Sequence, residues 1–169
     1  MTPTLTLPQF NALPEAEARV VLEGCCASRP WADAVLRGRP YPTREVLLSA
    51  AEGACLELPP ADLDEALAGH PRIGEAAAGD GASARLSRHE QAAVVGADSS
   101  VQERLRLANA AYEQRFSRVF LIRAAGRDPE EILAELRRRL ANDPHAERAE
   151  VARELADITG RRLEGLVTA

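Results

Sequence analysis

The sequence predicts an all-α fold: a single-domain bundle of about seven to nine helices with one short extended segment near residues 118–123. Three observations predict it. Apolar residues recur at helical spacing through nearly all of the 169 residues. Prolines or capping side chains stand at the start of most of these stretches. Only one short apolar run, residues 119–122, favours an extended strand. A chain of this length can bury its own core, so we interpret residues 1–169 as one domain.

Four helices are predicted in the first part of the chain. Pro14 can open the first helix, which stops near Gly24. A short second helix carries Trp31 and is followed by an extended break over residues 39–42. Thr43 is a candidate N-cap of the third helix, and the two prolines at 59–60 start the fourth.

Four more helices are predicted in the second part. Ser87 is interpreted as the cap of the fifth, and the sequence Ser100-x-x-Glu103 as a capping box that opens a long sixth. The seventh begins at residues 128–131, where a cap, a proline and two acids follow one another. The last helix begins after the break at 142–144 and carries an apolar stripe of Val151, Leu155, Ile158 and Leu166.

Residues 119–122 are the exception to the helical pattern. A lone strand cannot satisfy its backbone groups in a sheet. We therefore expect an extended segment that lies across helices. Its free N–H and C=O groups would then be available to a ligand.

Composition and charge exclude several classes of partner. The net charge of −5 and a pI near 5.3 argue against nucleic acid and anionic membranes, which select basic surfaces. No apolar run approaches the length of a membrane span. The first residues lack the pattern of a secretory signal, and three cysteines, two of them adjacent, do not suggest a disulfide framework. We expect a cytoplasmic protein with a small-molecule partner, and a homodimer is compatible with the sequence.

The most informative feature is a pair of polar segments at residues 70–75 and 87–91. His70 precedes Pro71, which disfavours helical backbone at His70 and places it where a helix has just ended. An imidazole there can face a cleft, and histidine suits proton transfer near neutral pH. The alternative is a surface histidine at a helix end. Ser87 and Glu90 likewise fit either a capping box or a ligand site, and Gln91 is unexplained by a cap.

Three other polar positions have competing interpretations. Arg162 lies on the apolar stripe of the last helix, so it either snorkels to water or pairs with an anion in a polar pocket. Asn109, at the edge of an apolar face, is typical of a buried amide that bonds backbone. The arginine run 137–139 is interpreted as a solvated helix face.

A metal site has little support in the sequence. His70, Glu75, His89 and Glu90 are close in sequence, but their spacing matches no known His–Glu metal motif, and no C-x-x-C is present. No cofactor motif is found either. The sequence thus predicts neither a metal nor a cofactor.

These residues resemble the OHCU decarboxylases of uric acid degradation, which convert 2-oxo-4-hydroxy-4-carboxy-5-ureidoimidazoline (OHCU) to (S)-allantoin. The specific part is the motif His-Pro-x-x-Gly at 70–74 combined with Ser-x-x-Glu-Gln at 87–91. The resemblance covers nearly the whole chain. It also takes in residues 10–14, 25–26, 29–32, 109–112, 116–122, 126–127 and 162–163.

The resemblance implies a cofactor-free carboxy-lyase with an all-α single domain. It implies that His70 is the catalytic acid–base, with Glu90 either orienting the substrate or tuning His70. The expected substrate-binding residues are Pro71, Ser87, Gln91, Arg162 and the backbone of Ser117, Arg118, Val119, Phe120, Leu121 and Ile122. Arg162 would meet the anionic substrate. The chain departs from the family at Ser117, where glycine is common, because serine lacks the free access of glycine to positive φ.

Two alternative functions remain open at this point. A helical binding or regulatory module could keep the fold without activity, although the intact set of polar residues favours the enzyme. A metal-dependent hydrolase of the same ureide pathway is the other.

The substrate of a decarboxylase in this family carries its own electron sink, a ring C=N beside the carboxylated carbon. Pyridoxal, thiamine or a metal is therefore not required.

Overall fold

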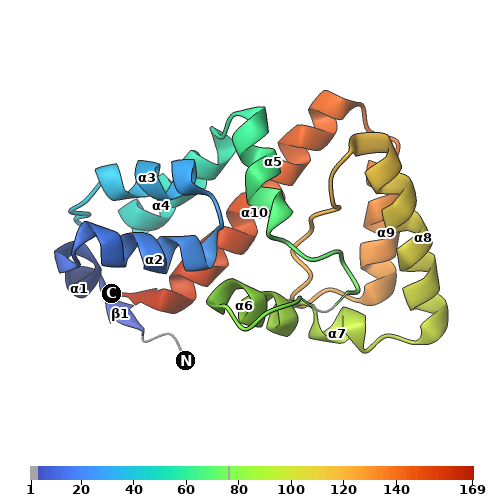
Figure 1. Cartoon of the computed structure of the whole chain (residues 1–169), viewed down its shortest axis with the longest axis horizontal. Helices are drawn as coiled ribbons and strands as arrows, with labels where there is room; N and C mark the ends of the chain where they lie inside the picture. The colour runs from blue at the N-terminus through green and yellow to red at the C-terminus, as the bar shows by residue number, and fades with distance from the viewer. Residues whose placement is uncertain (1–3, 76) are drawn as a thin grey trace.

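The computed structural model describes residues 4–75 and 77–169, and this part of the chain is all-α, as predicted (Figure 1). Its helices are α1 (Leu7–Ala12), α2 (Glu15–Cys25), α3 (Arg29–Arg37), α4 (Arg44–Leu56), α5 (Pro60–Ala68), α6 (Ala82–Glu90), α7 (Ala92–Val95), α8 (Ser99–Phe116), α9 (Pro129–Arg139) and α10 (Pro144–Leu166). Two short strands, β1 (Leu5–Thr6) and β2 (Val167–Thr168), pair in parallel and bring the chain ends together. The short helices α1 and α7 were not predicted. No helix in the described ranges has the length and apolar character needed to cross a membrane.

Helix α10 connects two parts of the molecule. Figure 1 shows α1–α4 at one end, α8 and α9 at the other, and α10 running between them. One apolar core forms where α10 packs on α2 and α4, and includes Trp31, Leu47 and Leu155. A second core lies between α8, α9 and residues 120–124, and includes Tyr112 and Leu136. Helix α10 contributes Val151, Leu155 and Leu163 among others to the first core, and Glu147 near its start is also buried.

Several predicted helix starts are confirmed. Thr43 caps α4 by accepting a hydrogen bond from the backbone of Val46. Asp128 begins α9 with a capping box, and Asp143 caps α10. These caps satisfy N–H groups that have no partner inside the helix.

Two predicted caps are wrong. Ser87 does not cap a helix, because α6 already begins at Ala82 and Ser87 lies buried in its last turn. Serine and glutamate three residues apart also share a face inside a helix, so their spacing alone could not separate the two cases. Helix α8 is capped by Asp98 rather than Ser100, since the carboxylate of Asp98 accepts from the first N–H groups.

The interpretation of the arginine run 137–139 is wrong for one residue. Arg137 and Arg138 are exposed, but Arg139 is 0% exposed and forms an ion pair with Glu147 of α10. Arg139 follows Ile132 and Leu136 at helical spacing, which places it on the buried face of α9. Three consecutive arginines suggested a solvated face, so the burial of Arg139 was not predicted.

The segment after α8 lies outside any helix or strand, as predicted. Phe120, Leu121 and Ile122 are buried within it. Ser117 ends α8 in the left-handed region, with φ 55° and ψ 31°. Serine thus adopts the conformation for which glycine is usual, at a cost of roughly 1 kcal/mol.

Candidate active site

Eight of the twelve predicted site residues line one small cavity, which lies between the segment after α5, helices α6 and α10, and residues 120–124. The predicted residues in its wall are His70, Pro71, Ser87, Glu90, Gln91, Phe120, Leu121 and Ile122. Ile73, Ala124 and Ile158 complete the wall and were not predicted to belong to the site. The cavity volume is about 20 Å³, enough for about one water molecule. Ser117, Arg118, Val119 and Arg162 do not line it, although Arg162 donates to the lining residues Ser87 and Glu90.

His70 is held by the end of α5. The helix ends at Ala68, and the Nδ1 atom of His70 lies 3.0 Å from the carbonyl oxygen of Ala66. A carbonyl only accepts, so Nδ1 carries the proton of the neutral ring and Nε2 keeps its lone pair. Nε2 is buried and has no hydrogen-bond partner within the described residues. The ring is therefore fixed in the tautomer that offers Nε2 as a base.

The electrostatic surroundings keep His70 neutral. Burial lowers the pKa of His70 to about 4, and the positive charge of Arg162 contributes in the same direction. The hydrogen bond to Ala66 and the carboxylate of Glu90 oppose this shift without cancelling it. At neutral pH the imidazole can accept a proton, and an anion bound beside it would raise its pKa and strengthen it as a base.

Arg162 does not snorkel to solvent, since the residue is only 4% exposed. Its Nε and Nη2 atoms donate to the two carboxylate oxygens of Glu90 at 2.8 and 2.7 Å. Nη2 also donates to Ser87 Oγ at 3.0 Å, while Nη1 donates to the carbonyl of Cys25 at 3.1 Å and to Ser83 Oγ at 3.4 Å. These contacts occupy all five guanidinium N–H groups. Arg162 thus fixes the orientation of Glu90 and Ser87 at the cavity wall.

Gln91 connects the two polar segments of the sequence. Its side-chain Oε1 accepts a hydrogen bond of 3.0 Å from the backbone N–H of Gly74, which has a φ of +89°. On the other side of the same segment, Asn109 Nδ2 donates to the carbonyl of Ile73 at 2.9 Å. Asn109 is the buried, backbone-bonding amide that the sequence indicated. The two amides fix the chain that follows His70.

Residues 120–122 line the cavity, and several of their main-chain groups have no partner among the described residues. The carbonyl of Leu121 accepts from Arg139 Nη1 at 2.7 Å. The backbone groups of Phe120 and Ile122 form no hydrogen bond with any residue that the structure describes. They are therefore available to a bound molecule.

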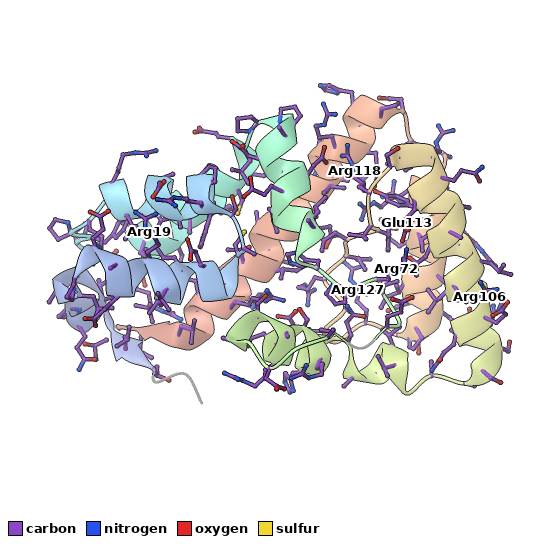
Figure 2. The ribbon with its side chains drawn as sticks, in the orientation of Figure 1. Arg19, Arg72, Arg106, Glu113, Arg118 and Arg127 are labelled. Carbon is purple, nitrogen blue, oxygen red and sulfur yellow. The ribbon has the colours of Figure 1, made fainter. Side chains whose placement is uncertain are left out.

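Arg118 has a different position from the rest of the predicted site. Its Nε lies 3.3 Å from a carboxylate oxygen of Asp64 on α5. Figure 2 shows it near the end of α8, far from Arg19 on α2. Its side chain pairs with α5 and does not line the cavity.

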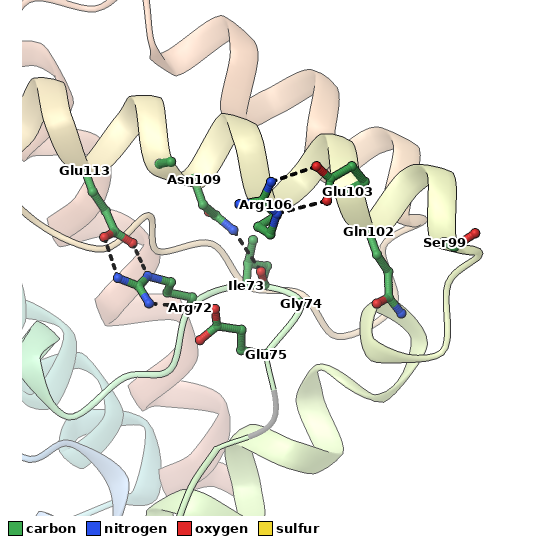
Figure 3. A pocket seen from close by; sticks show the side chains of 11 residues that line it. Arg72, Ile73, Gly74, Glu75, Ser99, Gln102, Glu103, Arg106, Asn109 and Glu113 are labelled. Carbon is green, nitrogen blue, oxygen red and sulfur yellow. Dashed lines mark hydrogen bonds and ion pairs between the residues drawn. The ribbon is translucent and has the colours of Figure 1, made fainter.

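The most spacious cavities lie elsewhere. One of about 580 Å³ lies between α8 and residues 72–75, and Figure 3 shows the Arg72–Glu113 and Arg106–Glu103 ion pairs in its wall. Another of about 680 Å³ lies between α4 and α10. Neither contains His70 or Glu90, and the first shares only Ile73 with the small cavity. A choice by volume alone would thus miss the cavity that contains both His70 and Glu90. Over residues 4–75 and 77–169 no cluster of three potential metal ligands is present.

Two curated proteins resemble this chain in sequence. The chain is 32% identical over 138 residues to the 2-oxo-4-hydroxy-4-carboxy-5-ureidoimidazoline decarboxylase of Amia calva, covering 80% of this chain and 79% of the relative. It is 30% identical over 146 residues to the uric acid degradation bifunctional protein TTL of Arabidopsis thaliana, covering 84% of this chain. It spans only 45% of that relative's length.

Solved structures show the same fold. A crystal structure of OHCU decarboxylase in the presence of (S)-allantoin superposes with a TM-score of 0.73 and 26% identity, covering 85% of this chain and 94% of that chain. An (S)-allantoin synthase structure gives a TM-score of 0.73 at 18% identity, over 96% of this chain and 54% of that one. The family model described as OHCU decarboxylase matches residues 11–164. The chain therefore belongs to the OHCU decarboxylase family.

Proposed function

We propose that the protein is a carboxy-lyase that converts OHCU to (S)-allantoin in uric acid degradation. One observation supports this above all. His70 presents an unpaired, unprotonated Nε2 in a cavity that also contains Glu90, whose orientation is fixed by a buried arginine. A neutral base, a carboxylate and free main-chain groups are what a decarboxylation without a cofactor requires from a protein.

The chemistry assigns a proton-transfer role to His70. When CO₂ leaves, its electron pair forms a double bond to the neighbouring ring carbon, and the C=N electron pair moves onto nitrogen. That nitrogen takes up one proton from the solvent, the proton that decarboxylation consumes overall. The hydroxyl group on the former carboxylated carbon loses its proton and becomes a carbonyl. The neighbouring carbon receives a proton on one face. We assign to His70 Nε2 the removal of the hydroxyl proton and its delivery to that carbon, because Nε2 is the free basic atom in the cavity.

Arg162 is proposed to hold the substrate carboxylate. All its donors have protein partners, so a carboxylate must replace one of them. The bond to Ser87 is the replaceable one within the cavity wall, because a neutral hydroxyl is a weaker acceptor for guanidinium than a carboxylate. The Glu90 fork can remain. This exchange also requires the cavity to widen, since ligand pockets usually measure several hundred Å³.

The direct test is incubation with freshly prepared OHCU while (S)-allantoin is followed by circular dichroism. We expect rapid formation of one enantiomer, and the same rate after EDTA treatment and dialysis. Binding of allantoin without turnover would identify an inactive binding module. Loss of activity on chelation with recovery on adding zinc or manganese would point instead to a metal-dependent enzyme.

A further inference from the structure

A second buried ion pair contacts the segment of residues 120–122, which lines the cavity. Arg139 of α9 and Glu147 of α10 are both 0% exposed. Arg139 Nε and Nη2 donate to the same oxygen, Glu147 Oε1, at 2.9 and 2.6 Å. The hydroxyl of Tyr112 donates to that oxygen as well, and Asn142 Nδ2 donates to Oε2 at 2.8 Å. The carboxylate is thus fully satisfied by protein groups.

Arg139 makes two contacts with the cavity-lining segment. Nη1 donates to the carbonyl of Leu121 at 2.7 Å. The guanidinium carbon lies 4.6 Å from the centroid of the Phe120 ring, a cation–π distance. Tyr112, which also bonds Glu147, packs edge to face on the same Phe120 ring, with ring centroids 5.2 Å apart. The segment is therefore fixed at a side chain and at the next carbonyl.

Fold stability alone does not account for a buried pair of this kind. Replacing a buried ion pair by well-packed apolar residues is often neutral or stabilising, because burying two charges is costly. An apolar side chain could fill the space but could not hold the carbonyl of Leu121. The particular capability of arginine here is to bond a carboxylate, a carbonyl and an aromatic face with one planar group.

We propose that Arg139 is a positioning residue for the decarboxylase reaction. Supported by Glu147 and Tyr112, it sets the path of residues 120–122 so that the free main-chain groups of Phe120 and Ile122 meet the substrate. This inference rests on the proposed function for its kinetic consequence. Its structural consequence, an ordered segment, is independent of that function.

The test compares Arg139→Lys with a matched control, Arg39→Lys. Arg39 has the same kind of contacts in the other core: Nη1 donates to the carbonyls of Phe10 and Leu13, each at 2.9 Å, and its guanidinium lies 5.7 Å from the Phe10 ring. Both variants keep the charge and lose the guanidinium fork. Steady-state kinetics with OHCU and calorimetric binding of (S)-allantoin are measured at a temperature where circular dichroism shows both variants folded.

We expect Arg139→Lys to raise KM and weaken allantoin binding by on the order of tenfold, the effect of misaligning one or two hydrogen bonds. Arg39→Lys should lower thermal stability and leave both values unchanged. Equal kinetics for Arg139→Lys and wild type would overturn the proposal. So would equal kinetic losses in both variants, which would indicate a general structural effect.

Hydrogen exchange keeps the inference testable apart from activity. Peptides covering residues 119–124 should take up deuterium faster in Arg139→Lys than in wild type, and at the wild-type rate in Arg39→Lys. If Arg139→Lys does not fold, Tyr112→Phe removes only the hydroxyl that supports Glu147, and should show the same acceleration in milder form. Unchanged uptake would overturn the positioning role. A wild-type protein that does not turn over OHCU would refute the proposed function without affecting this measurement.

Discussion

A buried ion pair joins α10 to another helix near each of its ends, and the two pairs have different roles. Glu147 and Arg162 lie on one stripe of the helix, fifteen residues apart, which is roughly 22 Å along its axis. Each is buried and forms an ion pair with another helix, Glu147 with Arg139 of α9 and Arg162 with Glu90 of α6. Between them the stripe is apolar, with Val151, Leu155 and Ile158.

The difference lies in access. Both side chains of the Arg139–Glu147 pair are completely buried, and protein groups satisfy them. In the other pair the Glu90 side chain is 22% exposed and lines the cavity beside His70. A sealed pair can only hold the protein's own backbone, whereas a pair open on one side can act on a ligand. The predictions below test whether this division of roles is correct.

The largest expected effect comes from the base beside the open pair. His70→Asn should lower kcat by about a hundred- to ten-thousandfold, because it removes a general acid–base group. The matched control is His145→Asn, an exposed histidine at the opposite end of α10, which should retain full activity. Both rates are measured with OHCU on folded protein. Activity of His70→Asn within threefold of wild type would remove His70 from the mechanism.

Removal of the negative charge from each pair should separate the two ends of α10. Glu147→Gln leaves the charge of Arg139 buried without its counter-ion, and should lower the free energy of unfolding by about 3–5 kcal/mol. Glu90→Gln should cost less stability, because this pair is partly open to water and Arg162 keeps its bonds to Cys25, Ser83 and Ser87. It should instead lower kcat/KM strongly. Urea denaturation and steady-state kinetics on the two variants decide the matter, and the same pattern in both would contradict the division of roles.

The two ends also differ in how well the sequence alone identified them. Arg162 was recognised because it interrupts an apolar stripe. Glu147 begins the same stripe, and Arg139 continues the face of Ile132 and Leu136, but both were missed. The neighbouring Arg137 and Arg138 made a charged run look solvated. Spacing can place a charge on a buried face, but whether a partner lies opposite depends on helices far away in the sequence.

The remaining errors have a similar cause. Ser87-x-x-Glu90 was compatible with a helix start and with a shared face inside a helix. The start of α6 at Ala82 and the contacts of both side chains with Arg162 distinguish the two. The helix ends at residues 68, 128 and 143 were predictable, because proline and aspartate act through local geometry. The convergence of residues 120–122 on His70 is a tertiary contact that local patterns do not encode.

The free energy of unfolding below neutral pH should depend on His70, which lies beside the partly exposed Arg162–Glu90 pair. The pKa of His70 falls from its ordinary value of 6.5 to about 4 on folding, mainly through burial. Between these values the unfolded state binds more protons, so the free energy of unfolding should rise with pH, by about 3 kcal/mol over this window. The contribution is complete above pH 6.5 and is lost as the pH falls through 4. In His70→Asn the free energy of unfolding should rise by about 3 kcal/mol less than in wild type between pH 4 and 6.5. An unchanged slope would show that His70 is not the buried neutral group.

The smallest expected effect concerns residues 117–126, the segment that follows α8. It begins at Ser117 with φ 55° and reaches Gly126 with φ +76°, both in the left-handed region. Ser117→Gly should relieve roughly 1 kcal/mol of backbone strain, partly offset by the greater freedom of glycine in the unfolded chain. The net gain should be about 0.5 kcal/mol, seen as a higher urea midpoint. Gly126→Ser should show the opposite sign, since it introduces the strain that Ser117→Gly removes.

Activity should be unchanged in Ser117→Gly, because neither buried ion pair is altered and the backbone keeps its path. A loss of activity there would mean that the Ser117 side chain itself takes part in substrate binding. The open site would then extend beyond the residues that line the cavity.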